Sequence, residues 1–61
     1  MAGFHFVMNG YGKNLIPRKL RIYPHTNEVE FRVLDPQGNQ LESVVVRRDE
    51  CVIMLQALKE H

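Results

Sequence analysis

The sequence predicts an α+β fold, in which a four-stranded antiparallel sheet is followed by one C-terminal helix (ββββα). Three observations lead to this prediction. Apolar residues recur at every second position in several short segments of the first 46 residues. Turn-forming residues such as Asp35-Pro36-Gln37-Gly38 separate these segments. After Arg47 the apolar period becomes that of a helix. With 61 residues, the chain is expected to form one domain, 1–61.

The first strand is expected from Phe4 to Met8, because the aromatic residues of this segment lie at alternate positions and therefore on one face. Residues 9–14, Asn-Gly-Tyr-Gly-Lys-Asn, are expected to form a turn or mobile loop. Glycine and asparagine favour such a segment because they tolerate positive φ. The second strand then follows Pro17.

The second and third strands are predicted to form a hairpin. Leu20 and Ile22 share one face of the second strand, and Val29, Phe31 and Val33 continue that apolar face on the third. Between them, Pro-His-Thr-Asn at residues 24–27 is expected to form a four-residue loop.

This loop predicts which side chains of the hairpin lie opposite each other. Arg21 is expected opposite Glu30, so that the carboxylate neutralises it, and Tyr23 opposite Glu28. Lys19 and Arg32 would then be a like-charged pair. Such a pair costs a few tenths of a kcal/mol and favours a bound anion, although it could also splay into water.

The fourth strand is expected at residues 41–46, where the apolar period is imperfect. Either a bulge near Ser43 resets the register, or residues 44–46 are covered on both faces. A helix of about 12 residues follows, with Asp49 at its N-cap or in its first turn. The residues at i, i+3, i+4 and i+7 that form its apolar stripe are Cys51, Met54, Leu55 and Leu58.

A chain this short buries only about 60% of the surface of its unfolded form. Its stability is therefore expected to depend on an additional source, such as disulfides, a metal or a partner subunit. One cysteine excludes an internal disulfide, and no Cys/His spacing suits a structural zinc, so no metal or cofactor is expected. Self-association is the source of stability that remains, and we expect a homodimer. Val52 and Ile53, which are apolar and lie outside the stripe, are its expected interface.

The chain is expected to be cytoplasmic. Its first residues lack the basic region and apolar stretch of a signal peptide. No apolar run approaches the roughly 20 residues that cross a bilayer, so no membrane partner is expected. A single free thiol fits a reducing compartment.

Charge is distributed unevenly along the chain. The first 27 residues hold four cations and no carboxylate, whereas all seven Asp and Glu residues lie at or after Glu28. Cations interleaved with tyrosines suit single-stranded nucleic acid, because its phosphates are anionic and its unpaired bases stack on aromatic rings. Tyr11 or Tyr23 would supply the stacking ring. The expected nucleic-acid-binding residues are Lys13, Arg18, Lys19, Arg21, Tyr23, Arg32, Arg47 and Arg48.

Three other interpretations are open, one of which is a purely structural, self-assembling protein. The cations could form a solvated face with cross-strand ion pairs, in which Arg47 and Arg48 pair with nearby carboxylates. Alternatively, the chain could be a protein-interaction module, a small inhibitor or accessory subunit, that docks through a sheet edge or through the flank of the helix at Val52 and Ile53.

Catalytic activity is not expected. His5, His25 and His61 lie on a strand, in a turn and at the terminus, a spacing that brings no two of them to one metal. Cys51 is expected to be a buried, inert thiol, because it lies on the apolar stripe of the helix.

Two partial resemblances support a regulator that binds single strands. The order of elements from Lys19 through the turn at residues 35–38 to the helix resembles single-stranded-DNA-binding coactivators of the positive cofactor four type. These are dimers that bind through a basic and aromatic sheet, which would place Lys19, Arg21 and Tyr23 on the binding strand. The segment Val44-Val45-Val46-Arg47-Arg48-Asp49-Glu50 is similar to the end of the carbon storage regulators, which implies an RNA contact by Arg48.

Overall fold

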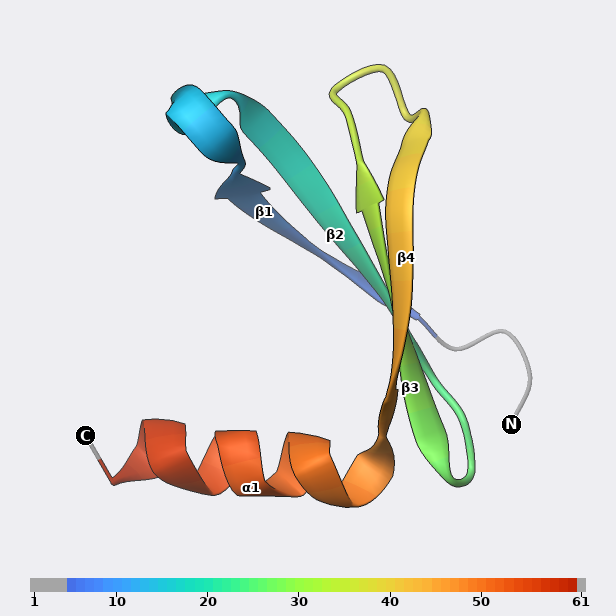
Figure 1. The fold of residues 1–61 in the computed structure, drawn as a ribbon, viewed down its shortest axis with the longest axis vertical. Coiled ribbons are helices and arrows are strands. Elements are labelled where there is room, and N and C mark those ends of the chain that lie inside the picture. Colours follow the sequence, from blue (N-terminus) through green and yellow to red (C-terminus); the bar gives the residue numbers. More distant parts are fainter. Residues whose placement is uncertain (1–4, 61) are drawn as a thin grey trace.

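The structure is a computed structural model that describes residues 5–60. Its four strands form one antiparallel sheet in the order β1-β2-β3-β4, and one helix follows them (Figure 1). The predicted ββββα fold class is therefore confirmed. The elements are β1 (Phe6–Tyr11), a short 3₁₀ helix η1 (Lys13–Leu15), β2 (Pro17–Pro24), β3 (Glu28–Leu34), β4 (Gln40–Arg47) and α1 (Arg48–Lys59).

Strand β1 extends further along the chain than expected. It continues through Asn9 and Gly10 to Tyr11, which pairs with Pro17, so the turn expected at residues 9–14 is wrong in its first half. Pairing with β2 supplies ladder hydrogen bonds that outweigh the turn preference of Asn and Gly. The reversal is made instead by η1, where Asn14 adopts a φ of 60°. Phe4, where the strand was expected to begin, lies outside the described residues.

The β2–β3 hairpin is formed as predicted, but its register differs from the expected one by two residues. Arg21 lies opposite Arg32, and Tyr23 lies opposite Glu30. Strand β2 extends one residue further than expected, to Pro24, which leaves a loop of only residues 25–27. Because a shift of two residues keeps every side chain on its own face, the predicted apolar face is retained while its cross-strand partners change.

The irregularity in β4 lies at Leu41, which has no partner in the ladder, whereas Gln40 and Glu42 pair with successive residues of β3. A bulge near Ser43 was expected, and this position is wrong. The alternative, coverage of residues 44–46 on both faces, is also wrong, because Val44 and Val45 are each about half exposed. The bulge thus lies near the 35–39 turn, and the rest of β4 pairs regularly.

The Asp35-Pro36-Gln37-Gly38 segment is a turn, as its composition predicts. The Oδ1 atom of Asp35 accepts hydrogen bonds from the backbone N–H groups of Gln37 (3.0 Å) and Asn39 (2.8 Å). Its Oδ2 atom accepts one from Nδ2 of Asn39, at 3.0 Å. Gly38 has a φ of 92°, a conformation that side chains disfavour. One carboxylate therefore holds most of the β3–β4 turn.

We predict that the Asp35 carboxyl titrates below its usual pKa of about 3.9. Hydrogen bonds from the side chain and then the backbone of Asn39 favour the charged form and lower its pKa. Because the folded pKa is below the unfolded one, this stabilisation is complete above about pH 4 and is lost as pH falls through the folded pKa. NMR titration of Asp35 tests the direction; a midpoint at or above about 3.9 contradicts it. Asp35→Ala, which lacks the carboxylate, should lose less stability than the wild type over the same acid range.

The buried core is small. Among the described residues, only Ile22, Val29 and Leu34 are buried apolar side chains. Helix α1, drawn in orange and red, projects from the end of β4 away from the sheet, and it contacts mainly β3 and β4 (Figure 1). Within the single chain, α1 is therefore not packed closely across a face of the sheet. Asp49 is in the first turn of α1, one of the two places expected for it, and Arg47 is the N-cap.

Candidate nucleic-acid-binding face

The sheet has two chemically different faces. The period of two along β2 and the observed register with β3 place five polar or aromatic side chains on one face, while the opposite face carries Leu20, Ile22 and Phe31. We name this first surface the basic face. It consists of Lys19, Arg21 and Tyr23 on β2 and of Glu30 and Arg32 on β3.

A cluster of stacked and paired groups occupies one part of the basic face. Nε of Arg32 donates to Oε2 of Glu30 at 2.9 Å, and Nη2 donates to Oε1 at 3.2 Å. The Arg32 guanidinium also lies over the ring of Tyr23, 4.4 Å from its centroid. That ring stacks on His5, with 5.1 Å between the centroids. Arg32 and Tyr23 therefore already have partners within the chain.

The pKa shifts agree with this geometry. The hydrogen bond from Arg32 lowers the pKa of Glu30, and the same hydrogen bond raises the pKa of Arg32. Both groups are therefore charged at neutral pH, and the charge of Arg32 is balanced locally. Residues two apart on a strand share a face, so Glu30 and Arg32 could have been paired from their spacing, a signal that cross-strand reasoning missed.

Arg21 is in the opposite situation. It lies across from Arg32, and its Nε is buried without a hydrogen-bond partner among the described residues. No carboxylate of the described chain forms a salt bridge with it. The expectation that Glu30 neutralises Arg21 is thus wrong, because the register places Glu30 opposite Tyr23. Arg21, and not Arg32, is therefore a cation whose charge is left unbalanced on this face within the described residues.

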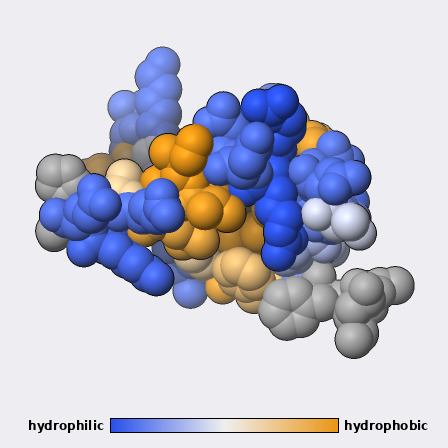
Figure 2. Space-filling view, turned by 90° about the horizontal axis from the view of Figure 1, so that it is seen from below, coloured by the Kyte–Doolittle hydropathy of each residue, from blue (hydrophilic) through white to orange (hydrophobic). Residues whose placement is uncertain are grey.

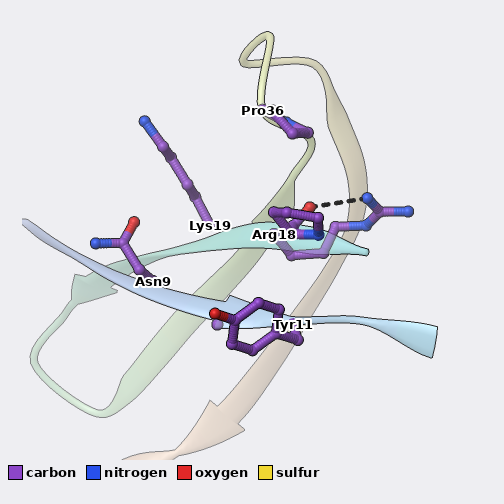
Figure 3. A pocket seen from close by; sticks show the side chains of 7 residues that line it. Asn9, Tyr11, Arg18, Lys19 and Pro36 are labelled. Carbon is purple, nitrogen blue, oxygen red and sulfur yellow. Dashed lines mark hydrogen bonds between the residues drawn. The ribbon is translucent and has the colours of Figure 1, made fainter. Parts of the chain in front are cut away.

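Lys19 and Tyr11 extend the basic face toward the end of β1. Lys19 is exposed, and the side chain of Tyr11 is 73% exposed. Both residues line an open pocket of about 300 Å³, and Pro36 is another of its lining residues. Figure 3 shows Lys19 and Arg18 pointing in different directions, with Nη1 of Arg18 donating to the carbonyl oxygen of Pro17 at 3.0 Å. Arg18 is therefore directed away from Lys19.

Three other predicted residues lie apart from this face. Lys13 is in η1, beyond one end of β2. Arg48 lies at the other end, where its backbone N–H and its Nη1 donate to the carbonyl oxygens of Asn27 and His25, each at 3.0 Å. Arg47 is beside it and pairs with Asp49 at 3.5 Å, as the ion-pair interpretation expects. An eight-residue strand spans about 25 Å, so the two ends form no single cluster.

The comparisons with known proteins add no relative. No family model, no curated protein and no solved structure matches this chain. Within residues 5–60, no group of three or more His, Cys, Asp and Glu side chains is placed to hold a metal ion. Among the helices described, none is long and apolar enough to cross a membrane.

Proposed function

We propose that this chain is a small regulator that binds single-stranded RNA or DNA, without catalysis and as a homodimer. The observation that carries the proposal is the state of Arg21, a cation on the basic face with no carboxylate partner in the described chain and with Arg32 opposite it. Lys19, which forms no salt bridge within residues 5–60, adds a second unbalanced charge two residues away on the same strand.

A phosphate group is the ligand that this arrangement favours. Glu30 balances the charge of Arg32, whereas Arg21 has no salt bridge within the described residues, so a bound anion would balance the charge of Arg21. Guanidinium groups hold phosphate oxygens by charge-assisted hydrogen bonds, which are about twice as strong as neutral ones. Lys19 would contact a neighbouring phosphate as a point charge.

Single strands suit this face better than a duplex. The formal net charge of the chain is only +1, whereas strong duplex binders are clearly basic. Unpaired bases stack on exposed aromatic rings, which contributes about 1–3 kcal/mol for each base. Tyr11 is exposed and borders Lys19, while the ring of Tyr23 is already stacked on His5. Tyr11 is therefore the ring that we assign to base stacking.

Fluorescence anisotropy with labelled single-stranded RNA and DNA tests the proposal. If Lys19 and Arg21 each neutralise one phosphate, the logarithm of the affinity falls with the logarithm of salt concentration with a slope of about −1.4. Raising the salt from about 50 to about 200 mM should then weaken binding about sevenfold. Absence of binding at about 50 mM salt rules the proposal out. A labelled duplex serves as the control and should bind more weakly than the single strands.

A further inference from the structure

The apolar face of the sheet and helix α1 enclose an open groove, which we name the helix groove. Its volume is about 350 Å³, and Arg48 lies among its lining residues. Figure 2 views the molecule from the side of α1 and shows apolar side chains gathered in the middle of that side, between groups of polar ones. The apolar residues used below are Met8 and Phe31 on the sheet and Val52, Met54 and Leu55 on α1.

The dimensions of the chain show that a large surface is left uncovered. Its accessible area is 5197 Å², whereas a compact monomer of 7.1 kDa exposes about 4,100 Å². Its radius of gyration is 12.7 Å, compared with about 10.5 Å for a compact domain of this length. The excess area is about 1,100 Å², and a stable interface of standard size buries about 800 Å² of each partner.

Helix α1 contributes to this exposed surface, and five of its large apolar residues are exposed. Every residue from Val52 to Lys59 is exposed, including Met54 and Leu55, which face the helix groove. An isolated helix of 12 residues is marginal in water, and most helices in proteins are stabilised by packing of their apolar face. This helix therefore needs a covering surface that its own sheet provides only in part.

We infer that the helix groove is filled by a second copy of this chain, with α1 of each copy packed in the groove of the other. Each copy carries both an open apolar groove and an uncovered apolar helix, so one two-fold rotation satisfies both needs in both copies. The uncovered area matches what such an interface buries. The inference rests on the homodimer of the proposed function and is independent of nucleic-acid binding.

The interface has a defined side. Val52, Met54 and Leu55 line the groove, and they belong inside the interface. Ile53 lies outside it, because one residue corresponds to a rotation of about 100° around a helix, and its side chain is 60% exposed on the far side. Of the two residues that the sequence assigns to the interface, the inference keeps Val52 and excludes Ile53.

Sedimentation velocity without nucleic acid tests the inference. The wild type is expected at about 14 kDa, twice the chain mass of 7.1 kDa. Leu55→Glu places a carboxylate in the interface and should raise the dimer dissociation constant by about 100-fold or more. Ile53→Glu is the matched control on the same helix and should change the dimer dissociation constant by less than about threefold. A monomeric wild type, or a dimer broken by Ile53→Glu and retained by Leu55→Glu, overturns the inference.

A second measurement does not depend on how well the Glu variant folds. In a mixture of isotope-labelled and unlabelled wild-type chains, filtered NOE spectra should show contacts between the Met54 methyl group of one copy and the Phe31 ring of the other. A dimer without these contacts uses another surface and contradicts the inference. A dimer that shows them and yet binds no single strand supports the inference and contradicts the proposed function.

Discussion

Replacing Lys19 and Arg21 together with glutamine is expected to weaken single-strand binding by about 30-fold at low salt. The double variant removes the two unbalanced cations of the basic face, while the Arg32–Glu30 pair and the stacked Tyr23 stay in place. The salt slope should shrink by about 1.4, because two phosphate contacts are lost. Anisotropy over a range of salt concentrations measures both quantities.

Lys59→Glu is the matched control for this pair of substitutions. It lowers the net charge by two, as the double variant does, but at the far end of α1. It should leave the affinity within about threefold of wild type, since charges beyond about a Debye length are screened. Equal weakening by the two variants would show that net charge, and not the basic face, governs binding.

Replacing Ile22 with alanine is expected to remove about 3 kcal/mol of stability. Ile22 is 5% exposed and is one of three buried apolar side chains in the described chain. A domain of this length has a total stability of about 3–9 kcal/mol, so a single cavity takes a large share of it. Urea denaturation at one fixed protein concentration measures the loss, because the apparent stability of a dimer depends on concentration.

The control for this substitution is Val45→Ala. Val45 is 56% exposed and lies opposite Glu30, on the same side of the sheet as the basic face. Little packing is lost, so the expected cost is below about 1 kcal/mol. If Ile22→Ala costs no more than Val45→Ala, the three buried residues are not the core of this protein.

The sequence was sufficient to predict the order of the four strands and the helix, and the apolar faces of β2 and β3. Alternation along β2 and β3 predicted that Ile22 and Val29 lie on the apolar face, and both are buried. The helical period after Arg47 likewise predicted a helix of about 12 residues, and α1 has 12. Periodicity depends on the chain alone, and so it needs no knowledge of what each face contacts.

The pairing of charges could not be predicted in this way. A shift of two residues between β2 and β3 leaves both apolar faces unchanged, so the hydrophobic pattern cannot distinguish the two registers. That shift places Arg21 opposite Arg32 instead of Glu30, while Glu30 pairs with Arg32 on its own strand. The apolar stripe of α1 likewise indicates which side of the helix is to be covered, but it does not identify the surface that covers it. In the single chain this side of the helix stays largely exposed.

The two faces of the sheet have opposite chemistry, and this has a consequence for affinity. An interface formed through the apolar face leaves the basic face of each copy directed outward. A single-stranded nucleic acid long enough to reach both copies would be bound at two basic faces. Once it is bound to the first, it would meet the second at a high effective concentration, because the two faces are held in one dimer. Such avidity lets a pair of weak sites act as one tight site. In the proposed dimer, the second copy would add apolar contacts to the small core of each chain and would double its modest positive charge.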